Sequence, residues 1–306
     1  MATIEAERRV LEATTPPSVA DWRTTCLNCG SALGGTFCSE CGQRAAPAHP
    51  SLRELGGEAF AEFSGWDGKI AETVRALIRK PGKLTVEFLE GRRARYISPL
   101  RLYLWCSVIY FLLAASTPNN FQSSIVVTPG PTPGVSSRPR IPASKTAGLT
   151  EADRQQIVQM IDQAPPILRP LMRRVSDDPK GFQGEMFASL PKALFALLPV
   201  FAGIVALFYR RRHFAEHLYF ALHLHAFIFV ALSLSAIVKL THVLSLEVVT
   251  GVVVLLWLPV YAHLAFRRVY GATAGVALLK EIGIGALYVA ASIPAVFVLA
   301  LWVASR

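Results

Sequence analysis

Five apolar stretches, each about twenty residues long, dominate the last two thirds of this 306-residue sequence. A helix needs roughly 20 apolar residues to cross the hydrocarbon core of a bilayer, because its backbone rises about 1.5 Å per residue. The sequence therefore predicts an all-α, multi-pass membrane protein, and 52% hydrophobic against 17% charged residues agrees with that class. The predicted spans are residues 98–116, 187–209, 217–239, 244–266 and 281–303.

The polar residues around these spans divide the chain into further segments. The longest polar segment contains the stretch TPGPTPGVSSRPRIP, which cannot form a sheet or a helix interior. Our predicted boundaries are a flexible tail at 1–24, a zinc ribbon at 25–45, basic amphipathic juxtamembrane helices at 50–97, the first transmembrane helix at 98–116, an extracytoplasmic Pro-rich loop at 117–185 and four further transmembrane helices within 186–303.

Four of the five cysteines form two matched CxxCG motifs near the N-terminus, at Cys26, Cys29, Cys38 and Cys41. Each motif can present two thiolates to one ion from a tight turn, and the glycine that follows permits the backbone geometry of such turns. Two motifs with eight residues between them predict a tetrahedral zinc site. Since four thiolates close the coordination sphere, we expect the zinc to be structural.

A redox pair is the alternative interpretation of these cysteines, but two matched motifs favour zinc. A disulfide framework is not expected, because the cysteines precede the first span and the N-terminal residues lack the apolar core of a signal peptide. Cys106 lies within the first span and is interpreted as a packing residue.

An arginine cluster marks the entry into the first span, with Arg92, Arg93, Arg95 and Arg101 directly before or at its start. Arginines beside an apolar run are retained on the cytoplasmic side and attract anionic lipid headgroups. The short connections that contain Arg210–Arg212 and Arg267–Arg268 belong on that side as well. We therefore predict a membrane protein with the N-terminus in the cytoplasm and the C-terminus outside.

The net charge of +10 is explained by these clusters, so nucleic acid is not an expected partner. Before the first span, Ile70, Val74, Leu77 and Ile78 form one apolar stripe on a basic helix. Such a helix can lie on the inner membrane surface, or its apolar face can pack against the other helices. The sequence leaves both alternatives open.

Several ionisable residues fall within or beside the third and fourth spans: Glu216, His217, His223, His225 and His263. Ionisable groups at membrane depth are costly, which makes them a candidate polar site. They could bind a metal, relay protons or hold a lipid headgroup. The alternative, which we favour, is that the histidines form hydrogen bonds across helices and that Glu216 pairs with Arg211 or Arg212.

The combined motifs resemble those of an uncharacterised family of bacterial membrane proteins. They are CxxCG, FCxxCGQ, KPGKLTVEFLEGRRARYISPLRLYL, EHLYFALHLHAF and FRRVYG, and they cover about residues 26–116 and 186–303. The resemblance implies an N-terminal zinc ribbon, with zinc at Cys26, Cys29, Cys38 and Cys41, before a multi-pass helical domain of unknown function. It also implies a location in a bacterial inner membrane, but it implies no activity.

The sequence contains no nucleophile elbow, phosphate loop or HExxH motif, so no catalytic residue is assigned. We expect the ribbon to be a cytoplasmic assembly, interaction or sensing module that contacts a cytosolic protein or folds against the basic helices. One alternative is a transporter that uses the Glu and His residues of the third span. Another is a membrane metalloenzyme with histidine ligands.

Overall fold

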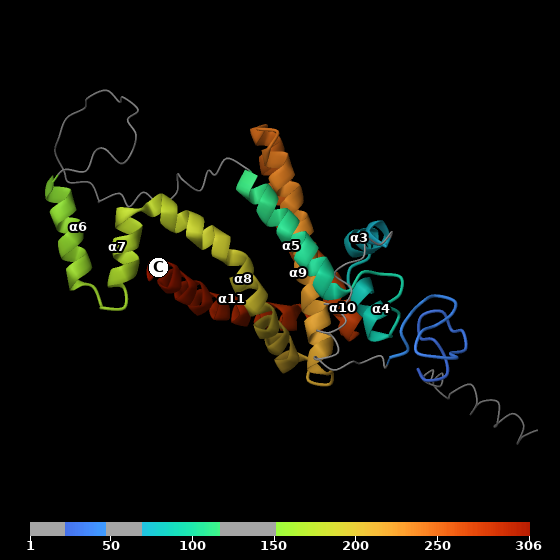
Figure 1. The fold of residues 1–306 in the computed structure, drawn as a ribbon. Helices are drawn as coiled ribbons and strands as arrows, with labels where there is room; N and C mark the ends of the chain where they lie inside the picture. The colour runs from blue at the N-terminus through green and yellow to red at the C-terminus, as the bar shows by residue number, and fades with distance from the viewer. Residues whose placement is uncertain (1–21, 47–68, 117–150) are drawn as a thin grey trace, which may run out of the picture. The chain divides into compact units, whose positions relative to one another are not determined.

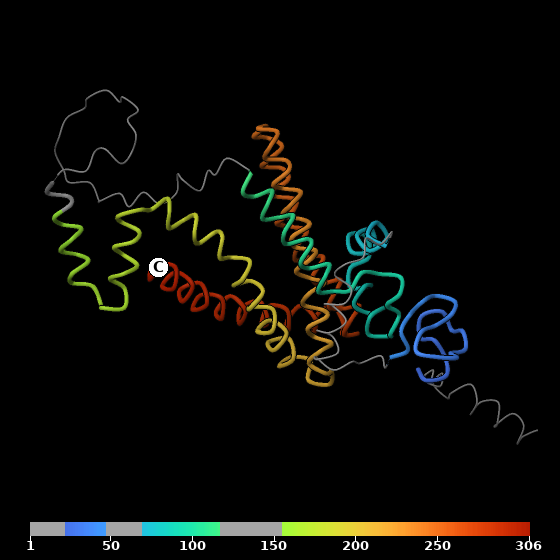
Figure 2. The backbone as a smooth tube through the Cα atoms, in the orientation of Figure 1, coloured from blue at the N-terminus to red at the C-terminus, as the bar shows by residue number. Residues whose placement is uncertain are grey.

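The computed structural model describes residues 22–46, 69–116 and 151–306, with side chains from residue 155 in the last range. Most of the predicted tail, the Pro-rich stretch and the region 50–68 lie outside the described residues. Within those ranges the chain is helical and contains no strand, apart from two isolated β-bridges in the ribbon (Figures 1 and 2). The predicted all-α class is confirmed.

Nine helices are described, and five of them are long and apolar enough to cross a membrane. The five are α5 (Pro99–Ser116), α8 (Pro179–Phe208), α9 (Phe214–Lys239), α10 (Leu244–Tyr270) and α11 (Ala274–Ala304). The others are α3 (Ile70–Arg79), α4 (Lys83–Leu89), α6 (Glu151–Gln163) and α7 (Arg169–Asp177). The chain is a multi-pass membrane protein, and residues 151–185 of the predicted loop contain α6, α7 and the start of α8.

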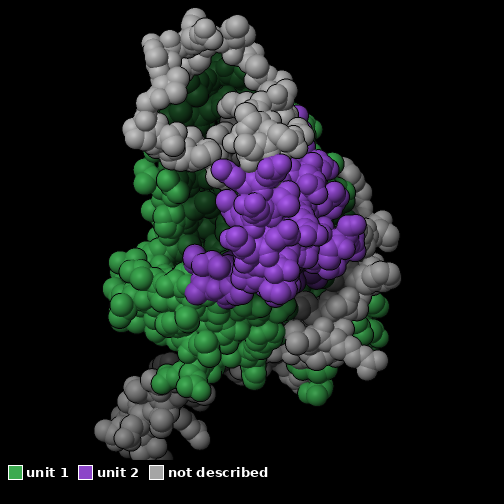
Figure 3. Space-filling model, turned by 90° about the vertical axis from the view of Figure 1, so that its left-hand side faces the viewer, with its two compact units in different colours: residues 1–117, 198–288 green, residues 118–197, 289–306 purple. Residues whose placement is uncertain are grey.

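Two compact units make up the chain (Figure 3). Unit 1 contains the ribbon, α3 to α5, the end of α8, α9, α10 and the start of α11, and spans residues Met1–Thr117 and Leu198–Tyr288. Unit 2 contains α6, α7, the start of α8 and the end of α11, within Pro118–Leu197 and Val289–Arg306. The candidate site lies entirely in unit 1.

Helix α9 is the centre of unit 1. In its most apolar 18-residue stretch, 56% of the residues are buried inside the protein, against 17% in α10 and 6% in α11. Helix α5 packs on α9 through the Tyr103 and Phe229 rings, and α10 packs on it through stacked Phe227 and Tyr261 rings. Large apolar side chains on α10 and α11 remain exposed, as Leu255 and Leu279 are, and such surfaces are suited to lipid.

Helices α3 and α4 contact the membrane helices, and of the predicted apolar stripe Leu77 is buried whereas Ile78 is 43% exposed. Leu77, Leu84 and Phe88 are buried. The turn between the two helices needs glycine, since Gly82 has a φ of 73° and a Cβ there would lie 2.9 Å from the Ala265 carbonyl oxygen of α10. This close approach fixes α4 against α10 and α9.

Candidate metal centre

The four predicted zinc ligands meet in the ribbon. Their sulfur atoms all lie within 4.8 Å of one another, and the Sγ atoms of Cys26 and Cys41, like those of Cys29 and Cys38, are 3.5 Å apart. Tetrahedral coordination with zinc–sulfur bonds of about 2.3 Å places the sulfurs about 3.8 Å apart. The arrangement therefore fits a metal ion that prefers four thiolates.

The two knuckles, residues 24–33 and 36–45, have the same backbone twelve positions apart. In the first knuckle the backbone N–H groups of Cys26, Gly30 and Leu33 donate to the carbonyl oxygens of Ser31, Cys26 and Thr24. In the second knuckle those of Cys38, Gly42 and Ala45 donate to the carbonyl oxygens of Gln43, Cys38 and Thr36, and all six bonds are 2.9 Å long. Gly30 and Gly42 have φ values of 78° and 71°, a conformation that favours glycine. Repeated local geometry thus presents the two pairs of thiols.

The thiols of the two motifs are not electrostatically equivalent. The hydroxyl of Ser31 lies 3.3 Å from the Cys29 sulfur, and hydrogen bonds from Ser31 to the thiolate lower the pKa of Cys29 to about 6. Burial raises the pKa of Cys41 to about 12. Coordination by a cation stabilises the thiolate form of all four ligands.

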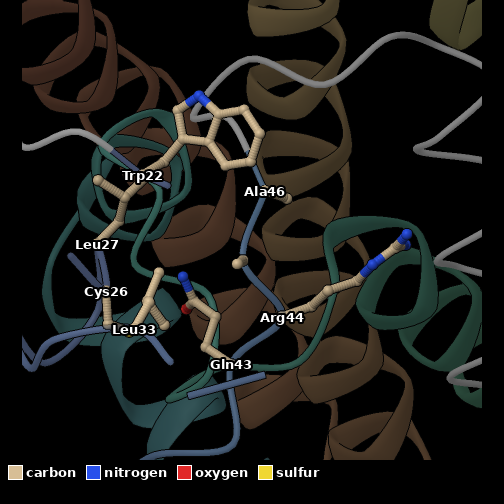
Figure 4. Close-up of a pocket in the computed structure, with 8 residues that line it drawn as sticks. Trp22, Cys26, Leu27, Leu33, Gln43, Arg44 and Ala46 are labelled. Carbon is tan, nitrogen blue, oxygen red and sulfur yellow. The ribbon is translucent and has the colours of Figure 1, made fainter. Parts of the chain in front are cut away.

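A crevice beside the metal centre is lined by side chains that include Trp22, Leu27, Leu33 and Gln43 (Figure 4). It has no room for even a water-sized molecule. We therefore interpret these residues as packing around the knuckles rather than as a ligand site.

One side chain fastens the ribbon to the entry of the membrane domain. The Gln43 amide donates to the Gly91 carbonyl oxygen over 2.7 Å, and its Oε1 accepts from the backbone N–H groups of Arg93 and Ala94, each over 2.9 Å. All three partners lie in the turn between α4 and α5. Nearby, Leu27 approaches Gly91 so closely that a Cβ at Gly91 would lie 2.5 Å from Leu27 Cδ1.

The predicted membrane-surface arginines lie around this same turn. Arg92 pairs with Glu87 over 2.7 Å and also with Glu90, while Arg95 pairs with Glu72 over 2.5 Å. The hydrogen bond from Arg92 holds the pKa of Glu87 below its ordinary value. Arg93 contributes its backbone to the ribbon contact, and Arg101 is buried at the start of α5. Their contact with lipid headgroups stays a prediction.

Basic residues also bridge helices near the starts of α9 and α11. Arg212 bonds Glu216 over 2.9 Å and the Val269 carbonyl oxygen, in the last turn of α10, over 2.8 Å. Arg268 donates to the Pro81 carbonyl, and Lys280 to the carbonyl of Phe208, the last residue of α8. Carbonyl groups at helix ends lack partners within their own helix, so these cations satisfy them.

The predicted polar residues of α9 do not converge on one site. His217 Nδ1 lies 2.9 Å from the Tyr270 hydroxyl of α10, and His223 Nδ1 lies 3.1 Å from the Thr85 hydroxyl of α4. His225 bonds the carbonyl oxygen of Ala221 and approaches the Tyr288 hydroxyl of α11. The three histidines therefore face three different neighbours of α9.

His263 lies apart from the α9 residues and pairs with Glu281 of α11, with its Nδ1 3.0 Å from a carboxylate oxygen. Glu281 is absent from the predicted site, because the predicted span begins at residue 281 and so places it at the membrane boundary. Helix α11 begins at Ala274, so Glu281 lies two turns after the start of the helix. The sequence signal for Glu281 was its position as a charged residue at the edge of an apolar run.

Among the residues that the structure describes, the four cysteines are the only group of three or more His, Cys, Asp or Glu ligands close enough to share a metal ion. Gln43 was also missed as a functional residue. The signal was its position directly after the second CxxCG motif, where the first motif has Ser31. Neither its acceptors nor its donors could be found from the sequence, since they lie about fifty residues away.

Residues 67–111 match a family model described as "Protein of unknown function (DUF3667)". The matched segment includes α3, α4, the turn that receives the ribbon, and most of α5. Comparison with curated proteins and with solved structures finds no match. The similarity is thus to an uncharacterised family, over the part of the chain where the ribbon contacts the membrane domain.

Proposed function

We propose that this protein is a bacterial inner-membrane protein whose N-terminal zinc ribbon organises the cytoplasmic end of its helical domain and serves there as an assembly or interaction module. The observation that carries the proposal is the contact of Gln43 with Gly91, Arg93 and Ala94. The metal site stabilises the fold of the ribbon, and through Gln43 it therefore also stabilises the turn between α4 and α5. No catalytic role is assigned to the ribbon.

Zinc is the metal that we propose, because four cysteine sulfurs at this spacing match its preference for tetrahedral thiolate coordination. The described ribbon has no helix or strand of its own and little apolar core. In so small a module, metal binding supplies most of the folding free energy. Loss of zinc would therefore remove the ribbon and its contact with the turn together.

The proposed orientation places the ribbon in the cytoplasm and the C-terminus outside. The clusters Arg92–Arg95, Arg210–Arg212 and Arg267–Arg268 flank the ends of α5, α8, α9 and α10. Thr85 of α4 contacts His223 of α9, and Pro81, just before α4, accepts a hydrogen bond from Arg268 of α10. These contacts support placing the start of α9 and the end of α10 on the same side as the ribbon. Anionic headgroups of the inner leaflet complement that charge.

One exposed side chain of the ribbon is suited to contact with a cytosolic protein. The Phe37 side chain, next to Cys38, is 63% exposed although aromatic rings are normally buried. An exposed ring on a metal-stiffened knuckle is the kind of anchor that interfaces use. We propose that a cytosolic partner contacts the ribbon at this side chain.

The test compares the wild-type protein with Cys41→Ser in detergent, using Cys106→Ser as the matched control. We expect one zinc per chain in the wild type and the control, and none in Cys41→Ser. Limited proteolysis should then cleave the turn at Arg92–Arg95 faster in Cys41→Ser alone. A turn that is equally protected without zinc would contradict the organising role, and a persistent metal would contradict the ribbon site.

The transporter and metalloenzyme alternatives are not carried further, since no observation favours them. The histidines of α9 face three different neighbours, and each has a local hydrogen-bonding partner. The contacts of His217 with Tyr270 and of His223 with Thr85 support the interpretation of these two histidines as links between helices.

A further inference from the structure

Unit 2 contains a helical hairpin formed by α6 and α7. The apolar sides of the two helices line a cavity of about 260 Å³ that is open to the outside. Its apolar lining consists of Ile157, Met160, Ile161, Leu171, Met172 and Val175. A cavity of this composition offers no charged group to a polar ligand.

The hairpin is held in this form by its own contacts. Arg169 at the start of α7 donates to the Ala164 carbonyl oxygen, just beyond the end of α6, over 2.9 Å. Arg173 pairs with Asp162 over 3.1 Å. Yet Met160 and Ile167 are 61% and 62% exposed. Polar contacts therefore hold the two helices together, while part of the apolar surface of the hairpin stays exposed in the described part of the chain.

Both helices are amphipathic. At 100° per residue, Leu171, Met172 and Val175 share one side of α7, and its three arginines occupy the other. On α6 the apolar lining residues likewise oppose a row of glutamines. Helices with this division commonly lie in the interface of a bilayer, with the apolar side among the acyl chains.

The connection to α8 brings the hairpin close to the membrane. A single residue, Asp178, separates α7 from α8, and Arg174 bonds Glu185 over 2.8 Å. Helix α7 is thus tied to the second turn of α8. With 30 residues, α8 is about 45 Å long, whereas the hydrocarbon core is only about 30 Å thick. The first turns of α8 contain Lys180 and Glu185, so they are the part that we expect in the headgroup layer, with the hairpin beside them.

We propose that the α6–α7 hairpin is an interfacial membrane-binding element whose open cavity receives the acyl chains of phospholipids. Residues 151–178 contain four Arg and five Asp or Glu, so the hairpin carries almost no net charge. Apolar contact rather than attraction to anionic lipid holds it on the bilayer. Its attachment is accordingly insensitive to salt and occurs on zwitterionic membranes.

The experiment places a photoreactive benzophenone amino acid at Met160 or at the adjacent Gln159 of the full chain, in phosphatidylcholine nanodiscs. Met160 lines the cavity and Gln159 lies on the polar side of the same helix. Leu255, 71% exposed on α10, provides the positive control for reaction with lipid. Mass spectrometry identifies the adducts after irradiation, at low and at high salt.

We expect about tenfold more phospholipid adduct at Met160 than at Gln159, unchanged by salt, because acyl contact buries the apolar side chain only. Three results would overturn the proposal. They are a Met160 cross-link to a second protein chain or to another part of this chain, equal low adduct at both positions while Leu255 reacts, and loss of the Met160 adduct at high salt.

Discussion

The two knuckles of the ribbon share one backbone but meet the membrane domain differently. Each has the same three hydrogen bonds and a glycine with positive φ. They differ where the domain is contacted. The first knuckle supplies apolar Leu27 where the second has Ser39, and the second supplies Gln43 where the first has Ser31. The repeat builds the metal site, and its departures from symmetry build the docking surface.

The largest expected effect tests the symmetric part of this comparison. Cys26→Ser and Cys38→Ser alter equivalent positions, so each should abolish zinc binding and unfold both knuckles. Binding of zinc to such modules is worth about 10 to 16 kcal/mol at neutral pH, far more than any single contact of the ribbon. Elemental analysis and amide exchange of residues 24–45 provide the measurement. Unfolding of only the mutated knuckle would break the equivalence.

Gln43→Ala and Ser31→Ala test the asymmetric part. Three hydrogen bonds at about 0.5 to 1.5 kcal/mol each suggest a loss of about 1.5 to 4.5 kcal/mol of docking free energy for Gln43→Ala, with zinc retained. Amide exchange of Arg93 and Ala94, whose N–H groups bond Gln43, should accelerate. Ser31→Ala should leave both amides protected, as should Arg44→Ala, a control on the adjacent side chain. Unchanged exchange in Gln43→Ala would contradict the docking contact.

A smaller effect is expected from glycine substitutions on the two sides of the contact. Gly30→Ala should cost about 1 to 2 kcal/mol, because only its left-handed backbone conformation is disturbed. Gly91→Ala carries the same penalty, with φ at 79°, and must also displace Leu27. Thermal unfolding with zinc present should rank Gly91→Ala as more destabilising. Adding Leu27→Ala to Gly91→Ala should restore the stability lost through the clash with Leu27, but not that lost through the backbone conformation. If the double variant is no more stable than Gly91→Ala, the contact with the first knuckle is contradicted.

The smallest effect concerns Glu87 and Arg92, which brace the turn from outside the ribbon. Because the pKa of Glu87 is lowered from its ordinary 4.5, the pair contributes stability above that pH, which is lost as pH falls through the lowered pKa. Both side chains are partly exposed, so Glu87→Gln should cost less than about 1 kcal/mol at neutral pH. Exchange of Arg93 and Ala94 below pH 4.5 should differ less between wild type and Glu87→Gln than at pH 7.

Local patterns account for what the sequence predicted correctly. The cysteine spacing and the apolar runs are properties of short segments, and they gave the four-cysteine cluster and five apolar helices. Contacts between distant segments were out of reach. Thr85 and His223 are 138 residues apart, and no pattern in either segment pairs them. The pairing of His263 with Glu281 of α11 also escaped prediction, because no pattern in either segment pairs them.

The placement of α4 against α9 and α10 has a consequence for the order of assembly. The ribbon leaves the ribosome before the membrane helices, but the turn to which Gln43 bonds follows directly on the α3–α4 segment. That segment contacts residues more than 130 positions later in the chain. Contacts at such sequence separation form late during folding. The ribbon is therefore expected to dock late, after α9 and α10 have entered the membrane, although it is synthesised before them.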